Sequence, residues 1–479
     1  MAAADTEVHV ITAEVREGTY GGKVAAVEPG GAELIPLSDR HGRPLDLFWT
    51  WMSPNLEFAT IFVGVISILY FKQSFWAAVA AIVVGTGLGS LTHGVLSSRG
   101  PRAGVPQMIL SRIGFGHLGN ILPAGLNAVV AGVGWFAVNS VSGAFALATL
   151  TGWDKLPCLF IVVVAQVVIA FFGHNLVQVF ERYAFPVLAV AFLLAVAWTF
   201  AKTDPGAAAA KGGGGIGGFL LTVGAAFGYA AGWNPYATDY TRYLEPDTSP
   251  RAVGLWAGLG VFVSCTVLEV AGAASVTIPG PIGDNLTGNF TQHLPVWLAD
   301  VTLLAIAVGA VSANVINIYS GAMSFLALGI RLPLNQRRAI VALMFGVAGF
   351  VLAWTGLKDA GAKYEGFLLV ISYWIGPWLG VYLTDWYLRR GKRVDGFLFD
   401  RRHNPWAGVL AMAIGMAVSV LLFSNQQDYT GPVPAHVKQF GDSTFEVGFV
   451  VSAVLYWIGF QLQGGKDREE TLTLAPAGS

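Results

Sequence analysis

Twelve long apolar stretches run through this sequence, and they restrict the possible folds more than any other feature. A helix that crosses a bilayer needs about 20 mainly apolar residues. Only 12% of the 479 residues are charged, about half of the roughly 25% that is usual in soluble proteins. We therefore predict an all-α integral membrane protein with twelve transmembrane helices. The stretches cover residues 47–70, 75–96, 119–149, 156–173, 183–202, 214–236, 252–277, 298–329, 337–355, 364–388, 404–423 and 445–463.

The distribution of Lys and Arg predicts how these helices are oriented. Cytoplasmic loops carry an excess of both residues. With the N-terminus in the cytoplasm, 21 of the 28 Lys and Arg residues fall in inside segments and 7 fall outside. Residues 1–46 are polar and lack the apolar core of a signal peptide. We expect cytoplasmic tails at 1–46 and 464–479, in a protein of the plasma (inner) membrane.

Composition also argues against several other classes of protein. A net charge of −1 gives no overall attraction to nucleic acid. Cys158 and Cys265 lie in apolar stretches, which argues against a disulfide framework. The sequence has no phosphate-binding motif of the Gly-Lys-Ser/Thr type. Without such a motif, the energy for any transport would come from an ion gradient or from a partner, or the protein would have no energy source. We expect no cofactor and no obligate protein partner.

Prolines interrupt the first and sixth stretches at matching positions. The breaks are Ser53-Pro54-Asn55 and Asn234-Pro235, and each follows a Trp (Trp51 and Trp233). Paired interruptions of this kind mark the substrate and ion site in secondary transporters; two ordinary proline kinks are the alternative. The pairing predicts two five-helix repeats, and we place them at 47–202 and 214–388, with two further helices at 404–463.

The segment that follows the second break, Pro235–Tyr243, reads as a short amphipathic helix that reaches the cytoplasmic surface. Asp239 and Arg242 are three residues apart, so the two side chains can pair on one helix face. We expect that pair to anchor the half-helix rather than to contact substrate.

Two further polar groups lie in the middle of apolar stretches. Trp135 and Asn139 are one helical turn apart in the third stretch, and Asn314 and Asn317 are three residues apart in the eighth. Such residues often hydrogen-bond between helices and simply hold them together. For the Ser residues nearby we favour that interpretation, whereas for Asn139 and Asn317 we favour contact with a ligand.

These residue types suit a flat, neutral, heteroaromatic ligand. The faces of two Trp side chains can sandwich a ring, since stacking contributes roughly 1–3 kcal/mol per base. Asn side chains can read a ring edge because each offers a donor and an acceptor. An amino acid would instead favour a cation or a free helix N-terminus for its carboxylate. We therefore predict stacking by Trp135 and Trp233, with polar contacts from Asn139 and Asn317.

Three carboxylates lie within or at the edge of the apolar stretches: Glu57, Glu269 and Asp300. Ionisable residues within a membrane are functional candidates by default. Glu57 follows the first break by two residues, so it is either a cation or proton site or a carboxylate that faces an aqueous vestibule. A sodium ion could bind the open carbonyls of the first break and the hydroxyl of Ser312.

At this point the sequence resembles the nucleobase–cation symporter-1 family, and more closely its cytosine/purine permease branch. The resemblance covers about residues 45–465. It implies a LeuT-type fold, with two inverted five-helix repeats, broken helices 1 and 6, and two extra helices. It also implies import of a nucleobase or related heterocycle with Na⁺ or H⁺. The matching segments are "FWTWMSPNLEF", "GWFAVN", "FERYAFPVL", "GWNPYATDYTRYL" and "NVINIYSG".

The same resemblance assigns roles to individual residues. It implies stacking by Trp135 and Trp233 and amide contacts from Asn139 and Asn317. It also implies polar positions at Ser53 and Asn314. We expect Tyr229 to contact substrate as well. The implied cation site comprises the backbone near Asn55–Phe58, with Glu57 and the Ser312 hydroxyl, and Na⁺ is the only metal expected there.

Two sequence positions bear on the ion and the substrate. Sodium-coupled members of the family often carry two adjacent hydroxyl residues in the eighth span, whereas Ser312 is followed here by Ala313. Both Na⁺ and H⁺ therefore stay open. Hydantoin transporters of the family carry Gln at the amide position of the third span, so Asn139 favours the cytosine/purine branch.

The resulting function is a secondary active transporter that imports cytosine, or a purine, by cation symport. The alternative is a symporter for another heterocycle, such as allantoin, hydantoin, hydroxymethylpyrimidine, thiamine or pyridoxine. A channel or a non-transporting receptor is more distant, because no continuous polar stripe or ring of charge is visible. An enzyme is not expected, because His93, His117 and His174 do not cluster in the sequence.

Overall fold

The computed structural model describes residues 31–172, 174–330, 337–390 and 395–463, and the part it describes is almost wholly helical. Within these ranges, eleven helices are long and apolar enough to cross a membrane, or twelve when one bent pair counts as a span. The helices are α1 (Asp46–Met52), α2 (Phe58–Leu69), α3 (Phe75–Ser97), α4 (Gly100–Ala103), α5 (Gln107–Leu110), α6 (Arg112–Gly119), α7 (Ile121–Val129), α8 (Phe136–Thr151), α9 (Lys155–Phe172), α10 (His174–Lys202), α11 (Gly215–Ala231), α12 (Ala237–Thr241), α13 (Pro250–Val276), α14 (Leu286–Thr291), α15 (Val296–Ala327), α16 (Arg337–Gly356), α17 (Ala360–Leu388), α18 (Trp406–Phe423), α19 (Pro432–His436) and α20 (Thr444–Leu462).

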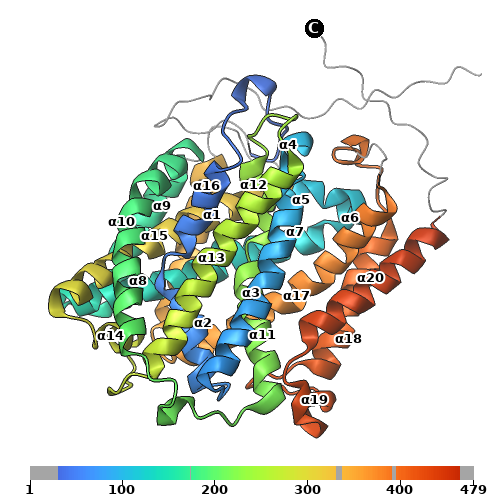
Figure 1. The fold of residues 1–479 in the computed structure, drawn as a ribbon. Helices are drawn as coiled ribbons and strands as arrows, with labels where there is room; N and C mark the ends of the chain where they lie inside the picture. Colours follow the sequence, from blue (N-terminus) through green and yellow to red (C-terminus); the bar gives the residue numbers. More distant parts are fainter. Residues whose placement is uncertain (1–30, 173, 331–336, 391–394, 464–479) are drawn as a thin grey trace, which may run out of the picture.

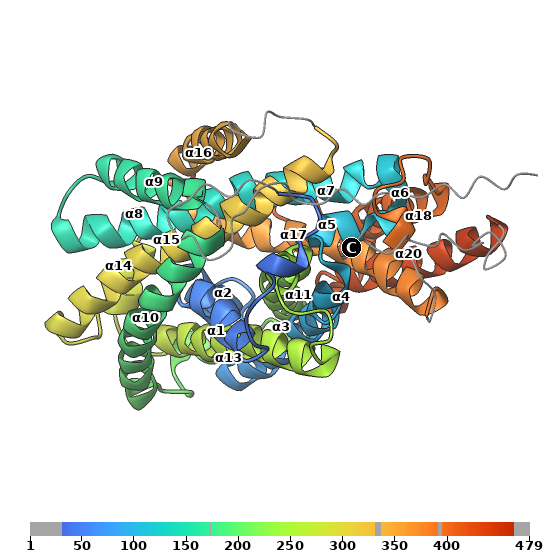
Figure 2. The same cartoon turned by 90° about the horizontal axis from the view of Figure 1, so that it is seen from above.

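The long helices pack into three groups (Figures 1 and 2). In the first, α13 packs against α2 and α3, and α11 packs against α3. In the second, α8 and α9 pack against α15 and α16. The third contains α17, α18 and α20, with α18 and α20 along one edge of the molecule. The helices of the two breaks thus belong to the first group and the polar third and eighth spans to the second.

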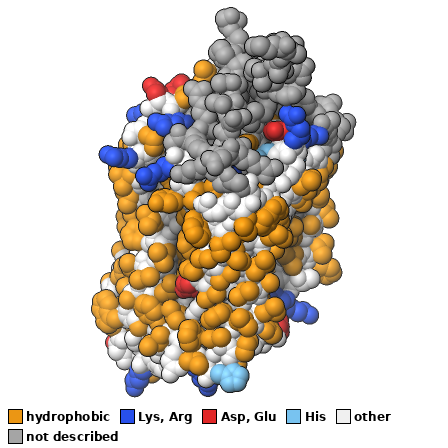
Figure 3. Space-filling view, turned by 90° about the vertical axis from the view of Figure 1, so that its right-hand side faces the viewer, with side chains coloured by type: hydrophobic (Ala, Val, Ile, Leu, Met, Phe, Trp, Pro, Cys, Tyr) orange, Lys and Arg blue, Asp and Glu red, His pale blue; other side chains and the backbone are white. Residues whose placement is uncertain are grey.

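The surface is organised as a membrane protein requires. Figure 3 shows apolar side chains over the middle of one face, with Lys and Arg at its two ends. A bilayer has no water in its core to bind backbone groups, so a chain that spans it must satisfy them within its own helices. The predicted count of twelve spans is confirmed when α1 and α2 are taken as one broken span.

The two breaks differ in shape. The first separates Asp46–Asn55 from Phe58–Leu69, and the two helical segments make an angle of 60°. Its 3₁₀ turn, Ser53–Asn55, carries Pro54 at an early position, where the missing N–H of proline costs little. The second break is a turn at Gly232 and Trp233 followed by a 3₁₀ turn at Asn234–Tyr236, and 215–241 still passes as one span.

The segment after the second break is not amphipathic, which corrects the sequence-based expectation. Residues 236–244 are all buried. Arg242 reaches Asp239 through the main-chain carbonyl of that residue (3.3 Å), and it also donates to the carbonyl of Gly31 (2.8 Å). The Asp239 carboxylate instead accepts from the backbone N–H of Gln107 (2.9 Å). The buried polar groups of this segment therefore hydrogen-bond to other segments of the protein rather than to water.

Residues 31–44 cover this end of the molecule, so part of the expected N-terminal tail belongs to the folded body. The backbone N–H of Ile35 donates to Gly104 (3.0 Å). Arg40 is buried and donates to the carbonyls of Pro101 (2.7 Å) and Leu244 (3.0 Å). Burial, together with the nearby Arg242, lowers the pKa of Arg40 to about 10. The side chain therefore stays charged at neutral pH, and carbonyl oxygens surround it.

Candidate functional site

The first predicted aromatic residue, Trp135, lies where the third span faces the second break. Trp135 ends a π-helical turn, Val130–Trp135, that interrupts the helix between α7 and α8. Such turns are rare and occur frequently at functional sites. A Cβ atom on Gly232 would lie 3.2 Å from Nε1 of Trp135, so the indole rests against the turn that precedes Trp233. The absence of a side chain at Gly232 allows this approach.

The first break holds the second aromatic residue in place. Trp233 Nε1 donates to Asn55 Oδ1 (2.8 Å), and Asn55 Nδ2 donates to the carbonyl of Trp51 (2.7 Å). The rings of Trp51 and Trp233 lie 5.8 Å apart, edge to face. The two breaks are therefore bound to each other through a single amide side chain, and Asn55 orients Trp233 as well as lying in the expected cation segment.

The three asparagines form one hydrogen-bonded cluster between α8 and α15. Asn314 Nδ2 donates to the carbonyl of Phe136 (2.8 Å) and to Ser140 Oγ (3.2 Å). Asn314 Oδ1 accepts from Nδ2 of Asn139 (3.0 Å) and from Nδ2 of Asn317 (3.3 Å). The hydrogen-bonding capacity of Asn314 is thereby filled, since an amide has two donors and one acceptor oxygen.

This cluster fixes the orientation of the other two amides. The Phe136 carbonyl can only accept a hydrogen bond, so Asn314 must turn its NH₂ group toward it. The oxygen of Asn314 then faces Asn139 and Asn317. Asn139 and Asn317 must then turn their NH₂ groups toward Asn314 and their oxygens away from it. Both oxygens are buried and have no hydrogen-bond partner among the described residues. An unpaired buried acceptor costs about 1–3 kcal/mol, so a ligand that carries N–H donors fits here.

The expected polar position Ser53 lies in the 3₁₀ turn of the first break, which packs against α15. Its side chain is buried, and its hydroxyl has no hydrogen-bond partner among the described residues. Tyr229 lies one turn before Trp233, with its ring perpendicular to that of Trp135 at 5.3 Å between centroids. The substrate candidates thus converge from the first, third, sixth and eighth spans.

The expected cation residues lie around the first break and on the part of α15 that packs against it. Glu57 caps the N-terminus of α2, and its Oε2 accepts from the backbone N–H of Ala59 (2.8 Å). A Cβ on Gly309 would lie 2.3 Å from the Leu56 carbonyl oxygen, so α15 presses against the break. Ser312 is buried three residues later, on the same side of α15 as Gly309.

Phe58 and Asn55 complete the expected cation set. Phe58 is the first residue of α2, and its ring stacks on that of Phe62 at 5.8 Å. The carbonyl of Asn55 accepts from the backbone N–H of Glu57 (2.9 Å) and from the Thr60 hydroxyl (2.6 Å). Oxygen ligands of this kind suit a hard cation such as Na⁺. Groups of three or more His, Cys, Asp or Glu that could hold a metal are absent from the described residues.

Sequence reasoning missed three residues at this site. Thr60 and Tyr364 both bind the backbone of the first break, because Thr60 donates to Asn55 and Tyr364 donates to the Ala59 carbonyl (2.8 Å). His93, expected at a cytoplasmic helix end, is fully buried with its ring 4.2 Å from that of Trp51. Thr60 could have been found from its place one turn after the break, but the other two come from distant helices.

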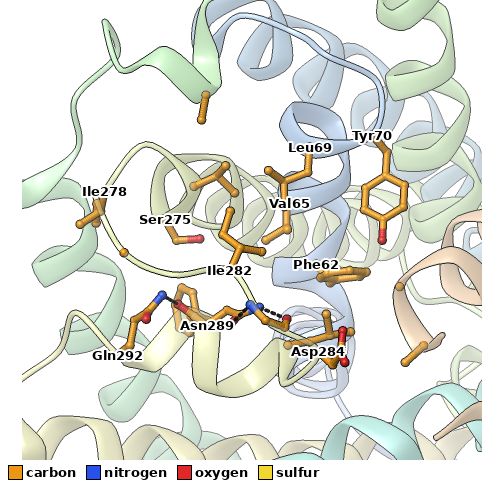
Figure 4. A pocket seen from close by; sticks show the side chains of 18 of the residues that line it. Phe62, Val65, Leu69, Tyr70, Ser275, Ile278, Ile282, Asp284, Asn289 and Gln292 are labelled. Carbon is orange, nitrogen blue, oxygen red and sulfur yellow. Dashed lines mark hydrogen bonds between the residues drawn. The ribbon is translucent and has the colours of Figure 1, made fainter. Parts of the chain in front are cut away.

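Two cavities lie at the end of the molecule opposite residues 31–44, and the described residues that line them include none of the residues expected to bind substrate. The outer one, of about 890 Å³, lies between α2, the end of α13 and α14 (Figure 4). The inner one, of about 410 Å³, is almost entirely apolar and reaches Gly134 and Ala137 beside Trp135. Both are lined by Phe62, Leu286 and Ala360, so they adjoin.

Comparison with known proteins gives consistent matches along most of the chain. A family model described as "Permease for cytosine/purines, uracil, thiamine, allantoin" matches residues 34–448. YxlA of Bacillus subtilis, named as a candidate purine-cytosine permease, is 30% identical over 446 residues, covering 90% of this chain and 95% of that protein. The purine-cytosine permease fcyB of Emericella nidulans is 27% identical over 451 residues, covering 90% and 87%.

The fold also matches a solved structure. Mhp1, a nucleobase-cation-symport-1 family transporter in a closed conformation with bromovinylhydantoin bound, superposes with a TM-score of 0.72 at 18% identity. The match covers 93% of this chain and 98% of Mhp1. The predicted LeuT-type fold is thereby confirmed. Because the family model covers most of the chain, this protein belongs to the family of permeases for cytosine, purines, uracil, thiamine and allantoin.

Proposed function

We propose that this permease imports a nucleobase, cytosine first or else a purine, together with a cation. The observation that carries the proposal is the pair of buried amide oxygens on Asn139 and Asn317, which point away from Asn314 and lack partners among the described residues. Amino-substituted bases such as cytosine and adenine present N–H donors along one edge. The names of the relatives, which are purine-cytosine permeases, favour the same class.

Stacking would supply the second part of recognition. Trp135 and Trp233 are both about 6% exposed, so a base that stacked on either indole would be almost wholly removed from solvent. A neutral base needs no countercharge, in keeping with a site whose direct readers are amides and indoles. Asn314 would act by holding Asn139 and Asn317, rather than by touching the base.

The coupling cation would bind at the first break, beside Glu57 and the carbonyls that follow Ser53-Pro54-Asn55. Ser312 lies on the face of α15 that contacts this break, which supports a hydroxyl ligand there. Position 313 is Ala and cannot add a second hydroxyl. The chemistry therefore admits Na⁺ or H⁺, and the transport assay must distinguish them.

Two further features belong to the proposal. The excess of Lys and Arg in the inside segments supports cytoplasmic termini in a plasma (inner) membrane protein. The matching breaks support the assignment of 47–202 and 214–388 as repeated halves, with 404–463 as an addition. Cysteine-accessibility labelling at either terminus would test the orientation.

The deciding experiment is uptake of labelled cytosine into proteoliposomes. An inward Na⁺ gradient and an inward proton gradient are imposed in turn, with unlabelled adenine, hypoxanthine, uracil, allantoin and hydroxymethylpyrimidine as competitors. Gradient-driven uptake would support symport and name the ion. If folded protein neither takes up nor binds cytosine, and only allantoin or a vitamin ring competes, the nucleobase assignment is wrong.

A further inference from the structure

A groove on the outer surface runs between α3 and α13, which lie side by side at the edge of the helix bundle (Figure 2). It has a volume of about 680 Å³, and glycines from both helices form its floor. A Cβ atom on Gly94 would lie 2.5 Å from the carbonyl oxygen of Gly254, and one on Gly258 would lie 3.0 Å from that of Ser90. The two backbones therefore touch at the floor, and the glycines leave the space above it open.

The walls of the groove are apolar and face outward. Leu91 of α3 is 65% exposed and Leu255 of α13 is 56% exposed. In a chain that spans a bilayer, exposed leucines within the long helices contact lipid chains rather than water. The walls and the floor therefore suit an acyl chain, which has no polar group to satisfy.

One end of the groove carries two positive charges. Arg251 lines the groove in the first turn of α13 and is exposed. Arg99 directly follows α3, and its guanidinium lies over the ring of Trp386 at 5.4 Å from the ring centroid. Within the described part of the chain neither guanidinium forms an ion pair, although Glu245 and Asp247 lie in the loop before α13. Two positive charges without a countercharge at the membrane boundary attract an anionic group.

Trp386 of α17 places this end of the groove at the membrane boundary. It lines the groove close to the end of α17, and Trp is enriched where a bilayer meets water. The basic end is also where α3 ends and α13 begins, on the side of the molecule that residues 31–44 cover. A lipid headgroup would therefore lie at this end, with its chains directed along the groove away from it.

Ser90 adds a buried polar group to the groove. It lines the floor and is only 3% exposed, and its hydroxyl has no hydrogen-bond partner among the described residues. Ser98, near the end of the same helix, instead donates to the carbonyl of Val95 (2.7 Å). Ser90 lies beside Gly258, seven residues from Arg251, so about 10 Å of helix separates it from the basic end. The ester oxygens of a phospholipid lie between its phosphate and its chains, where they can accept from this hydroxyl.

We propose that this groove binds an anionic phospholipid from the leaflet on the side of residues 31–44. The phosphate lies between Arg251 and Arg99, an ester oxygen accepts from Ser90, and one acyl chain runs over the glycine floor toward Gly87. Basic pockets between membrane helices bind anionic headgroups in this way. The site lies outside the substrate and cation residues, so it goes beyond the proposed function and does not depend on it.

A second copy of this chain is the competing occupant, and the charges argue against it. Two copies in one membrane are related by an axis along its normal, so a two-fold contact at this groove would bring the same end of each copy together. Arg99 and Arg251 would then face their counterparts, and like charges that face each other destabilise an interface. A lipid phosphate instead supplies the missing negative charge.

The test measures lipid binding to the purified protein by native mass spectrometry in a neutral detergent. The probes are palmitoyl-oleoyl phosphatidylglycerol, which is anionic, and palmitoyl-oleoyl phosphatidylcholine, which has the same chains and no net charge. Arg99→Gln and Arg251→Gln each remove one charge from the groove. Arg402→Gln is the matched control, because Arg402 is an exposed Arg that pairs with Asp400 (3.4 Å) and does not line the groove.

Each Arg near a membrane surface contributes about fivefold to the affinity for anionic lipid. We expect the wild type to bind phosphatidylglycerol about 25-fold more tightly than phosphatidylcholine, and Arg99→Gln and Arg251→Gln each to reduce that preference about fivefold. Arg402→Gln should keep the wild-type preference. Equal binding of the two lipids by the wild type, or a full preference in Arg251→Gln, would overturn the site.

Two further variants test the groove apart from its charge. Gly87→Leu fills it, because a Cβ atom at this position meets only Phe262, at 3.7 Å. This variant should lose binding of both lipids and keep the wild-type melting temperature in lipid-free detergent. Ser90→Ala should weaken both lipids alike, since both carry the ester group. Full lipid binding in either variant would contradict this placement of the lipid. Dimers in lipid-free detergent that Gly87→Leu abolishes would assign the groove to a second copy and refute the proposal.

Discussion

Replacing Asn314 with Ala tests whether a residue that does not face the substrate controls the ones that do. The substitution removes four hydrogen bonds, at 2.8, 3.2, 3.0 and 3.3 Å. It leaves the NH₂ groups of Asn139 and Asn317 without the partner that orients them. A buried unpaired donor costs about 1–3 kcal/mol, so the stability of the fold should fall by about 2–6 kcal/mol before any relaxation.

The effect on affinity follows from the lost orientation. Each amide oxygen that no longer faces the base forfeits one net hydrogen bond, about 0.5–1.5 kcal/mol. Two such losses give about 1–3 kcal/mol, which corresponds to a weakening of cytosine binding by about 5- to 150-fold. Asn139→Ala removes one of the two amides that would contact the base. We expect it to weaken cytosine binding less than Asn314→Ala does and to reduce discrimination between bases.

The assay pairs a binding measurement with a thermal melt in the same detergent. Asn127→Ala is the matched control, because Asn127 also joins the third and eighth spans, through Ser324 Oγ (2.7 Å), without belonging to the asparagine cluster. It should lower the melting temperature and leave cytosine affinity unchanged. If Asn314→Ala behaves in the same way, with unaltered affinity, the idea that the cluster orients the readers is refuted.

Three further outcomes are expected. Trp233→Ala should abolish cytosine binding through loss of stacking, and retained affinity in a titration would remove this residue from the site. Ser312→Ala should weaken the ion dependence of uptake several-fold while cytosine affinity at saturating ion is kept; an unchanged ion response would contradict its role as a ligand. Burial, together with Lys202, lowers the pKa of His293 from 6.5 to about 4. Between these values the unfolded chain binds more protons, so stability should rise with pH across this window. Melting temperatures of His293→Gln should lose that slope and those of the exposed control His436→Gln should keep it.

Sequence alone was sufficient for the spans and the breaks. The thickness of a bilayer sets the length of an apolar helix, so twelve stretches could be recognised without knowledge of their neighbours. Proline acts on the turn next to it, which is why Pro54 and Pro235 located both interruptions. The four residues expected to touch a base, on the third, sixth and eighth spans, also lie where these spans converge, and their part in binding stays a prediction.

Tertiary structure decided what those residues are bound to. The filled capacity of Asn314 depends on the carbonyl of Phe136, which belongs to another helix. The place of Tyr229 between Glu57 and Trp135 likewise depends on how α2, α8 and α11 approach each other. Hydrogen bonds between helices distant in sequence depend on packing, and no local pattern encodes them.

The segment after the second break shows the same division. Its polar residues predicted an amphipathic helix at the water boundary, because local periodicity records only which side chains are polar. In the fold, residues 31–44 cover that helix, and Arg242 binds the carbonyl of Gly31 in place of water. The sequence by itself determined a twelve-span transporter with two broken helices and a set of polar residues within its spans. The structure determined which of these residues hydrogen-bond to one another and which keep buried polar atoms without a partner among the described residues. These contacts depend on side chains that are brought together only when the helices pack.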